Sequence, residues 1–358
     1  MPIHKISIVP TWSFRDQNGR ELDPQLFMLL RQIEAQGKLT AAAKTAGISY
    51  RHAWNQLNKW ADFFGSPLVE LEKGRGAKLT PLGDKLLWAE KRVIARLEPQ
   101  LDNITSELNI DLSRLLSGVR PSLRMHASHG YAVELLPQHV QDFELDLQYK
   151  NARDALASLT REQCDLAGFH LPLGQIGRQM SETHFRFLKP RAHRIIRFIT
   201  RQQGLMVAPG NPLGVSNLHD LFGRGVRFIN REPNSGTRLL LDALLAQEGL
   251  ENSEQLEGGG TEFTHSAVAA HVASAMADAG FGVQAAASQF GLAFIPLARE
   301  HYLFVCHHRT LEQPACRNLI DLLSSNTFRE AVHKLPGYDA EACGSVITVE
   351  ELMDGLPG

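Results

Sequence analysis

The spacing of apolar residues changes along the chain. Near the N-terminus they recur three or four positions apart, as at Leu26, Leu29, Leu30 and Ile33, which places them on one face of a helix. From about residue 120, short apolar segments such as LRMHAS alternate with helical segments such as YAVELLPQHVQDF, and this alternation predicts parallel α/β units. We therefore expect domains at 1–80, 81–112 and 120–340, followed by a tail at 341–358.

The first part of the chain is predicted to form a hairpin and then a helix. The segment HKISIVPTWSF is rich in β-forming residues and DQNG is a turn signal, so we expect a hairpin over residues 4–22. Asp23 and Pro24 suit the N-cap and the first position of a helix, which runs to about Gln36 and is ended by Gly37.

The next segment, LTAAAKTAGISYRHAWNQLNKWADFFG, has the pattern of a helix-turn-helix. Thr40 is expected to cap a short helix, Gly47 to allow a left-handed turn, and Ile48 to fill the corner between two helices. Ser49 is expected to cap the second helix, whose Leu57 and Trp60 are assigned to the core. The residues assigned to DNA contact are Thr40, Ser49, Tyr50, Arg51, His52, Trp54 and Asn55.

A basic hairpin follows the helix-turn-helix. Residues 67–79, PLVELEKGRGAKL, predict two short strands about a Gly-Arg-Gly tip, and Arg75 and Lys78 are placed to meet phosphates or the minor groove. The net charge of the chain is only −2, but 12 Lys and Arg face six Asp and Glu between residues 31 and 96. This local excess suits a module that binds double-stranded DNA as a dimer.

A long helix is predicted from about Leu82 to Leu108, capped by Thr80-Pro81. It has little core of its own, so we expect it to pair with its copy in a homodimer or homotetramer. The four cysteines form no C-x-x-C pair, and the chain shows neither a secretion signal nor an apolar stretch long enough to span a bilayer. These features favour a reducing cytoplasm and no membrane partner.

The N-terminal motifs resemble a known family. The sequences A-A-A-K-T-A-G-I-S-Y-R-H-A-W, P-L-V-E and G-R-G-A-K-L-T-P-L-G look like the DNA-binding domain of the molybdate-dependent (ModE-type) regulators, and the S-Y-R-x-A-W run separates them from the wider LysR-type regulators. This resemblance covers about residues 1–110 and implies an α+β winged domain that dimerises. It also implies that the helix starting at Ser49 enters the major groove of a palindromic site.

The rest of the chain departs from that family, because it lacks the small repeats that hold molybdate in ModE-type regulators. Residues 121–335 instead resemble a two-lobed periplasmic-binding-protein fold of type II, molybdate-binding-like, in its cytoplasmic branch. The motifs are D-L-A-G-F-H-L-P, N-S-G-T-R-L-L-L-D, T-H-S-A-V-A-A and A-D-A-G-F-G-V-Q. The resemblance implies an α/β sensor with a hinge near Gln203–Pro209 and a return near Leu292–Leu303.

Three segments of this sensor are candidates for ligand binding, because each joins a strand to a helix N-terminus, where backbone N–H groups attract anions. Arg238 offers a guanidinium fork, and His170 and His265 offer ring N–H groups. A simple helix cap at Ser128 and a core role for His170 remain equal alternatives. The full set is Ser128, His129, Gly130, His170, Asn234, Ser235, Gly236, Thr237, Arg238, Thr264 and His265.

No catalytic or metal-binding constellation is found, so neither an enzyme nor a cofactor is predicted. We expect a ligand-responsive transcriptional regulator that senses a small oxyanion, molybdate or tungstate, or a small carboxylate such as formate. Lobe closure is expected to act on the winged domains through the long helix. A solute-receptor-like protein without a regulatory role is the alternative.

Overall fold

The computed structural model describes residues 6–21, 23–72, 76–117, 120–222, 225–250, 256 and 260–355. The chain divides into two compact units, Val9–Ala95 and a larger one that joins Met1–Ile8 to Arg96–Gly358. In the described part of the chain, no helix combines the length and the apolar character that a bilayer span requires.

The small unit is a helix-turn-helix with a wing. Its elements are α1 (Gln25–Gln36), α2 (Leu39–Thr45), α3 (Tyr50–Phe64), β1 (Val69–Glu72) and β2 (Gly76–Leu79), and α4 (Pro81–Ser117) begins in it. The strands β1 and β2 pair antiparallel. The apolar face predicted for the first helix is buried, with Leu30 fully inaccessible, and it packs in one core with the equally inaccessible Trp60 of α3. The turn residue Gly47 has the predicted left-handed conformation, with φ 69°.

Two local predictions in this unit are wrong. The hairpin expected over residues 4–22 is reduced to one bridge between Arg15 and Glu21, because Ile6 and Ile8 bond instead to side chains of α4. Thr40 does not cap α2, since that helix already begins at Leu39 after Lys38. Ser49 does cap α3 as predicted, and its hydroxyl accepts from the His52 amide at 3.1 Å.

The large unit is built on one mixed sheet with the order β4-β3-β5-β10-β6-β9-β7-β8. Its strands are β3 (Ser122–Ala127), β4 (Glu144–Tyr149), β5 (Leu166–Pro172), β6 (His193–Val207), β7 (Phe228–Arg231), β8 (Thr261–Glu262), β9 (Ala279–Val283), β10 (Ala293–His307), β11 (Tyr338–Asp339) and β12 (Val346–Thr348). Strands β3, β4 and β5 run parallel to one another, as do β7, β8 and β9. We call these two parallel groups, with their helices, lobe 1 and lobe 2.

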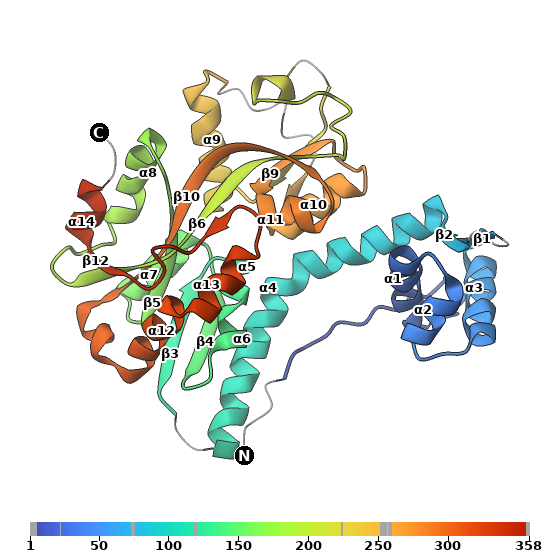
Figure 1. The fold of residues 1–358 in the computed structure, drawn as a ribbon, viewed down its shortest axis with the longest axis horizontal. Coiled ribbons are helices and arrows are strands. Elements are labelled where there is room, and N and C mark those ends of the chain that lie inside the picture. Colours follow the sequence, from blue (N-terminus) through green and yellow to red (C-terminus); the bar gives the residue numbers. More distant parts are fainter. Residues whose placement is uncertain are drawn as a thin grey trace. The chain divides into compact units, whose positions relative to one another are not determined.

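The helices cover the sheet in the order that α/β alternation predicts. They are α5 (Tyr131–Glu134), α6 (Leu136–His139), α7 (Ala152–Thr160), α8 (Gln175–Phe185), α9 (Gly236–Gln247), α10 (His265–Ala273), α11 (Gln284–Gln289), α12 (Pro314–Ser324), α13 (Asn326–His333) and α14 (Val349–Asp354), with short 3-10 turns at His219–Leu221 and His308–Glu312. In Figure 1, α9, α10 and α11 lie at one end of the sheet, and α7 and α12 lie at the other.

The two lobes are joined by the long strands β6 and β10. These strands pair antiparallel along their whole length, from His193 opposite His307 to Val207 opposite Ala293, and Figure 1 shows them side by side. The predicted hinge, Gln203–Pro209, overlaps β6 up to Val207, and the predicted return, Leu292–Leu303, overlaps β10 from Ala293 onward. We call this pair of strands the hinge ladder.

Each lobe has the same Arg–Asp clamp at its edge. In lobe 1 the Arg124 amide donates to Asp165 Oδ2 at 2.9 Å, and in lobe 2 the Arg227 amide donates to Asp278 Oδ2 at 2.9 Å. In both cases the guanidinium pairs with the other carboxylate oxygen, at 2.8 and 2.6 Å. The clamps tie the start of one parallel strand to the start of another, so the two lobes are built alike.

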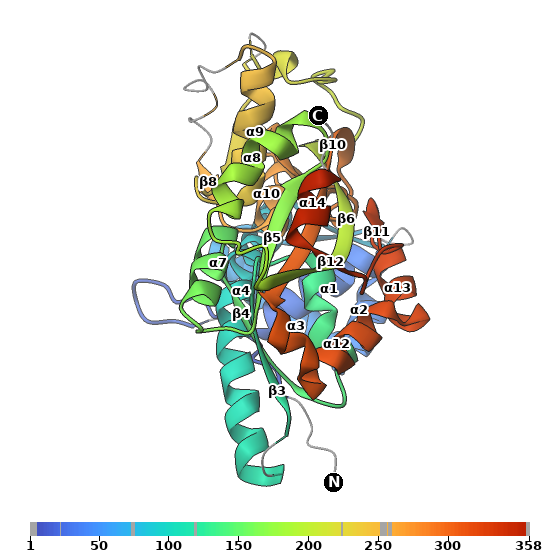
Figure 2. The same cartoon turned by 90° about the vertical axis from the view of Figure 1, so that its left-hand side faces the viewer.

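The predicted tail is not separate from lobe 1. Strands β11 and β12 pair with β6, and Val349 and Leu352 of α14 are buried in the core of that lobe. The long helix α4 extends past its predicted end at Leu108 to Ser117. Figure 2 shows its C-terminal half running alongside β4.

Candidate functional sites

The second helix of the helix-turn-helix presents a polar and aromatic face to solvent. Tyr50 and Trp54 are 50% and 46% exposed, which is unusual for large apolar rings on a small core. Arg51, His52 and Asn55 are exposed as well, whereas Leu57 and Trp60 are buried as predicted. Among these side chains, His52 contacts another residue of the same helix, with its Nε2 atom 3.1 Å from Gln56 Nε2.

The wing is fixed against the first helix rather than free. The Ala77 amide donates to Gly37 O at 2.8 Å, and a Cβ on Gly76 would lie 2.3 Å from that oxygen, so only glycine fits there. Lys78 is exposed on β2, as its predicted DNA contact requires. Arg75 lies outside the described residues. Thr40 is exposed on α2, although it does not cap that helix.

The centre of the hinge ladder carries a buried ion pair. Arg201 and Glu300 are register partners on β6 and β10, with Nε and Nη2 each 2.7 Å from Oε1. Gln203 donates to the same oxygen at 2.7 Å and to Thr237 Oγ1 at 3.3 Å. Burial alone lowers the pKa of Arg201, but Glu300 and Tyr338 outweigh it and the pKa is raised. This pair is therefore charged and internally neutralised.

A second arginine, Arg231, is half-buried and forms no ion pair within 4 Å among the described residues. Arg231 is the last residue of β7, and its Nη2 donates to the carbonyl oxygen of Phe263 at 2.8 Å. Its Nε and Nη1 atoms are buried and have no hydrogen-bond partner among the described residues. Burial, followed by repulsion from Arg201, lowers the pKa of Arg231 to about 10, so it remains a cation at neutral pH. The carboxylates of Glu232, Glu262 and Glu300 act on Arg231 without outweighing burial, and an anion that approached its unpaired nitrogen atoms would lower the cost of burying them.

Three of the predicted histidines lie within electrostatic reach of the arginines. Burial and Arg231 lower the pKa of His129 to about 3. Burial, followed by the charges of Arg201 and Arg231, holds the pKa of His170 well below its usual value. Burial, followed by the charges of Arg231 and Arg201, does the same for the pKa of His265. All three rings are therefore neutral, and each can donate one N–H to an anion. We call these histidines, with Arg201, Arg231 and Glu300, the anion cluster.

The other predicted ligand residues surround this cluster in different ways. Gly130 and Gly236 let Arg201 and His170 pack closely against the backbone, since a Cβ would lie 3.3 Å from Arg201 Nη1 and from His170 Cδ2 respectively. Ser235 and Thr264 cap α9 and α10 with their side chains, which is a common structural role for such residues. Ser128 accepts from Tyr302 through its backbone oxygen at 2.9 Å, and Asn234 is exposed.

Arg238 does not present the free guanidinium fork that its position in the sequence suggested. Its Nε donates to Asp242 Oδ1 at 2.8 Å, one turn along the same helix, so its charge is already paired. The sequence reasoning missed Arg201, Arg231 and Glu300. A signal was present only for Arg231, a charged residue at the end of the short apolar strand FINR, whereas β6 and β10 carry several other charged and polar residues.

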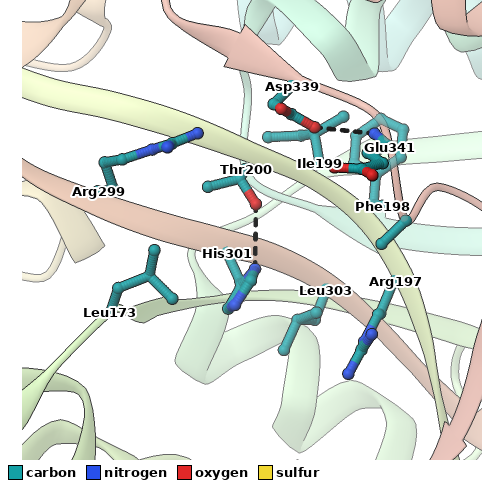
Figure 3. A pocket seen from close by; sticks show the side chains of 11 residues that line it. Leu173, Arg197, Phe198, Ile199, Thr200, Arg299, His301, Leu303, Asp339 and Glu341 are labelled. Carbon is teal, nitrogen blue, oxygen red and sulfur yellow. Dashed lines mark hydrogen bonds between the residues drawn. The ribbon is translucent and has the colours of Figure 1, made fainter.

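A cavity of about 420 Å³ lies on the opposite face of the hinge ladder. Figure 3 shows Arg299 and His301 on one side of it and Asp339 on the other. Because side chains alternate along a strand, His301 points away from the anion cluster that its neighbour Glu300 joins. Arg299 is exposed and screened by water, so the buried cluster is the stronger candidate for binding a charged effector.

The comparisons with known proteins agree with this division of the chain. Residues 133–324 match the model of the PBP superfamily domain, and residues 24–84 match that of the bacterial regulatory helix-turn-helix proteins of the lysR family. The uncharacterized protein YvgK of Bacillus subtilis is 30% identical over 231 residues, which are 64% of this chain and 74% of YvgK.

Two further relatives match over shorter lengths. The molybdenum-pterin-binding protein MopB of Rhodobacter capsulatus is 30% identical over 124 residues, 34% of this chain and 45% of MopB. The DNA-binding transcriptional dual regulator ModE of Escherichia coli K12 is 30% identical over 114 residues, 30% of this chain and 44% of ModE. The chain thus spans less than half the length of these two relatives. The chain belongs to the PBP superfamily, and ahead of that domain it carries a helix-turn-helix that matches the lysR-family model over residues 24–84.

Proposed function

We propose that this chain is a cytoplasmic transcription regulator that binds a small anion at the anion cluster and thereby changes its affinity for DNA. The anion is an oxyanion, molybdate or tungstate, or a small carboxylate such as formate. A link to molybdoenzyme metabolism is supported by the similarity to MopB, whose name describes a molybdenum-pterin-binding protein.

The observation that carries this proposal is the guanidinium of Arg231. Two of its nitrogen atoms are buried without a hydrogen-bond partner in the described part of the chain, in a cluster where the only other arginine is paired with Glu300. A planar guanidinium presents N–H groups in a fork that matches two oxygen atoms of a carboxylate or oxyanion. An anion placed there would recover part of the electrostatic cost of burying Arg231.

The residues of the anion cluster come from both lobes and from the hinge ladder between them. His129 and His170 belong to lobe 1, Arg231 and His265 to lobe 2, and Arg201 to β6. A contact between the lobes is already present, since Tyr131 Oη lies 2.8 Å from Ser266 Oγ. An anion held by both lobes favours the arrangement in which they are close, and only such a difference in affinity shifts a conformational equilibrium.

The DNA partner is double-stranded DNA with two-fold-related half-sites, bound by the exposed face of α3 and by Lys78. We propose that two copies of the chain associate through α4, as a homodimer or as part of a homotetramer. The support is an exposed apolar stripe, in which Ile104, Leu108 and Leu115 are 52%, 39% and 81% exposed and lie on one helix face. A C2 dimer built on this stripe matches a palindromic site.

A gel shift with the full chain tests the proposal. The probe is the DNA upstream of the chain's own coding sequence, at fixed salt, with and without sodium molybdate, tungstate, formate or sulfate. We expect at least one anion other than sulfate to change the midpoint of binding and to raise the melting temperature of the protein. Anion binding without any DNA binding would instead favour a solute-receptor-like protein, and binding of neither would reject the function.

A further inference from the structure

The C-terminal half of α4 is bound to the edge of lobe 1 by side chains that reach backbone groups of β4. Asn103 Oδ1 accepts from the Tyr149 amide at 2.6 Å, and Ser106 Oγ accepts from the Leu147 amide at 3.1 Å. Further along the helix, Ser113 donates to Glu144. An edge strand offers unpaired backbone groups, and these polar side chains satisfy some of them. The helix is therefore part of lobe 1.

The same stretch of α4 reaches the anion cluster on the lobe 1 side. Asp102 Oδ2 lies 3.9 Å from His129 Nε2, and His129 also lies 3.2 Å from Glu134 Oε1 of α5. The ring of Tyr149, whose amide Asn103 holds, packs edge-to-face on His129 at 4.8 Å between centroids. The orientation of His129 is thus set by groups on α4, α5 and β4 together.

Two turns earlier, α4 contacts lobe 2. The guanidinium of Arg96 lies over the ring of Phe263, 5.2 Å from its centroid. The backbone oxygen of Phe263 is the group that accepts from Arg231 Nη2 at 2.8 Å. One short segment of helix therefore contacts a neighbour of His129 in lobe 1 and a neighbour of Arg231 in lobe 2.

From these contacts we propose that α4 supplies positioning residues of the effector site. Asp102 and Asn103 position His129, and Arg96 acts through Phe263. The placement of α4 therefore depends on the separation of the two lobes. Arg96 and Asn103 are seven positions apart, which corresponds to about 10 Å of helix at 1.5 Å per residue. A helix of fixed length cannot keep both contacts when the lobes separate, so anion binding and the placement of α4 are thermodynamically linked. The helix begins at Pro81, directly after the wing.

This inference rests on the proposed effector role, and its test uses the full chain with sodium formate and sodium molybdate as probes. In Arg96→Gln the cation over Phe263 is removed, and in Asn103→Ala the bonds to Tyr149 are removed. We expect both variants to bind DNA without an anion as the wild type does. Because both residues position the effector site, the anion affinity of each variant is measured first and the gel shifts are run at saturating anion. The effect of the anion on DNA affinity, typically about 5- to 150-fold in allosteric proteins, should fall below about twofold.

Arg114→Gln is the matched control, because Arg114 lies on the same helix, is 64% exposed and is 4.0 Å from Asp111. It should keep the full effect of the anion. An undiminished effect in both Arg96→Gln and Asn103→Ala would overturn the inference while leaving the proposed function intact. If no anion binds the wild-type chain, the proposed function itself fails. Hydrogen exchange at residues 96–106 gives a second readout: anion binding should slow it, and unchanged exchange with anion bound also overturns the inference.

Discussion

Arg201 and Glu300 face each other across the hinge ladder as register partners, with Arg201 Nε 2.7 Å from Glu300 Oε1 and side chains only 2% and 1% exposed. Because this pair neutralises itself, the excess positive charge of the anion cluster resides on Arg231. The consequences of that arrangement can be measured one residue at a time.

Replacing Arg231 by Gln should abolish anion-induced stabilisation. The variant keeps a polar side chain but loses the buried cation, so calorimetric titration with formate and molybdate should show at least a tenfold loss of affinity, about 1.4 kcal/mol. Without an anion the variant should be at least as stable as the wild type, since a buried charge without a partner has been removed.

The matched control for that variant is Arg238→Gln. Arg238 already pairs with Asp242 on its own helix, so its loss should change anion affinity much less. A larger loss in Arg238→Gln than in Arg231→Gln would restore the assignment made from sequence alone and reject the one made from the structure.

Replacing Glu300 by Gln should destabilise the protein strongly. The change leaves Arg201 buried without its counter-charge, and breaking a buried pair on one side costs about 3–5 kcal/mol. Urea denaturation followed by circular dichroism measures the free energy of unfolding. Glu341→Gln, at an exposed position, is the control and should change it by less than about 0.5 kcal/mol. Equal stabilities for the two variants would show that the pair contributes nothing.

The charge of the anion should decide how binding depends on pH. The charges that act on Arg231 are those of Arg201, Glu232, Glu262 and Glu300. A monoanion such as formate adds one negative charge to this set and should bind with little proton uptake. A dianion such as molybdate adds a second negative charge that raises the pKa of the nearby histidines, so its binding should take up a proton and tighten as pH falls. Titration calorimetry in two buffers of different ionisation enthalpy measures that uptake, and an identical heat in both would contradict the prediction.

The buried histidine His184 should make folding stability depend on pH. Burial, opposed by a hydrogen bond that the ring donates to the backbone of His170, lowers its pKa to about 4, below the value of about 6.5 in the unfolded chain. The unfolded state therefore binds the proton first, and stability should fall as pH drops from about 6.5 toward 4. Urea denaturation at pH 6 and pH 5 should show His184→Gln losing about 1 kcal/mol less than the wild type over that unit. Parallel losses would contradict the assignment.

Replacing Arg51 by Ala should weaken DNA binding without affecting the anion. Arg51 is exposed on the face of α3 that carries Tyr50 and Trp54, so the variant should lose about 1–3 kcal/mol of affinity for the operator if it reads a base. A gel shift at fixed salt measures the loss. Arg15→Ala removes an exposed arginine that is paired with Glu21, and its midpoint should stay close to that of the wild type.

Much of the helix-turn-helix could be predicted because its signals are local. The cap at Ser49, the turn at Gly47 and the burial of Leu57 and Trp60 depend on a few neighbouring residues, and all three were confirmed. The hairpin at residues 4–22 was mispredicted because its strand-like segment bonds to α4, about a hundred residues further along the chain. Competition of that kind leaves no trace in local sequence.

The sequence by itself determined the helix-turn-helix, the PBP-like domain and the α/β alternation of the sensor, because motifs and periodicity are properties of consecutive residues. Only the tertiary structure decided which arginine is unpaired. Arg238 meets its carboxylate one helical turn away, whereas Arg201 meets Glu300 across the hinge ladder and Arg231 meets none among the described residues. Pairing of charges depends on distance in space and on exclusion of water, and both are set by how the strands are brought together in the fold.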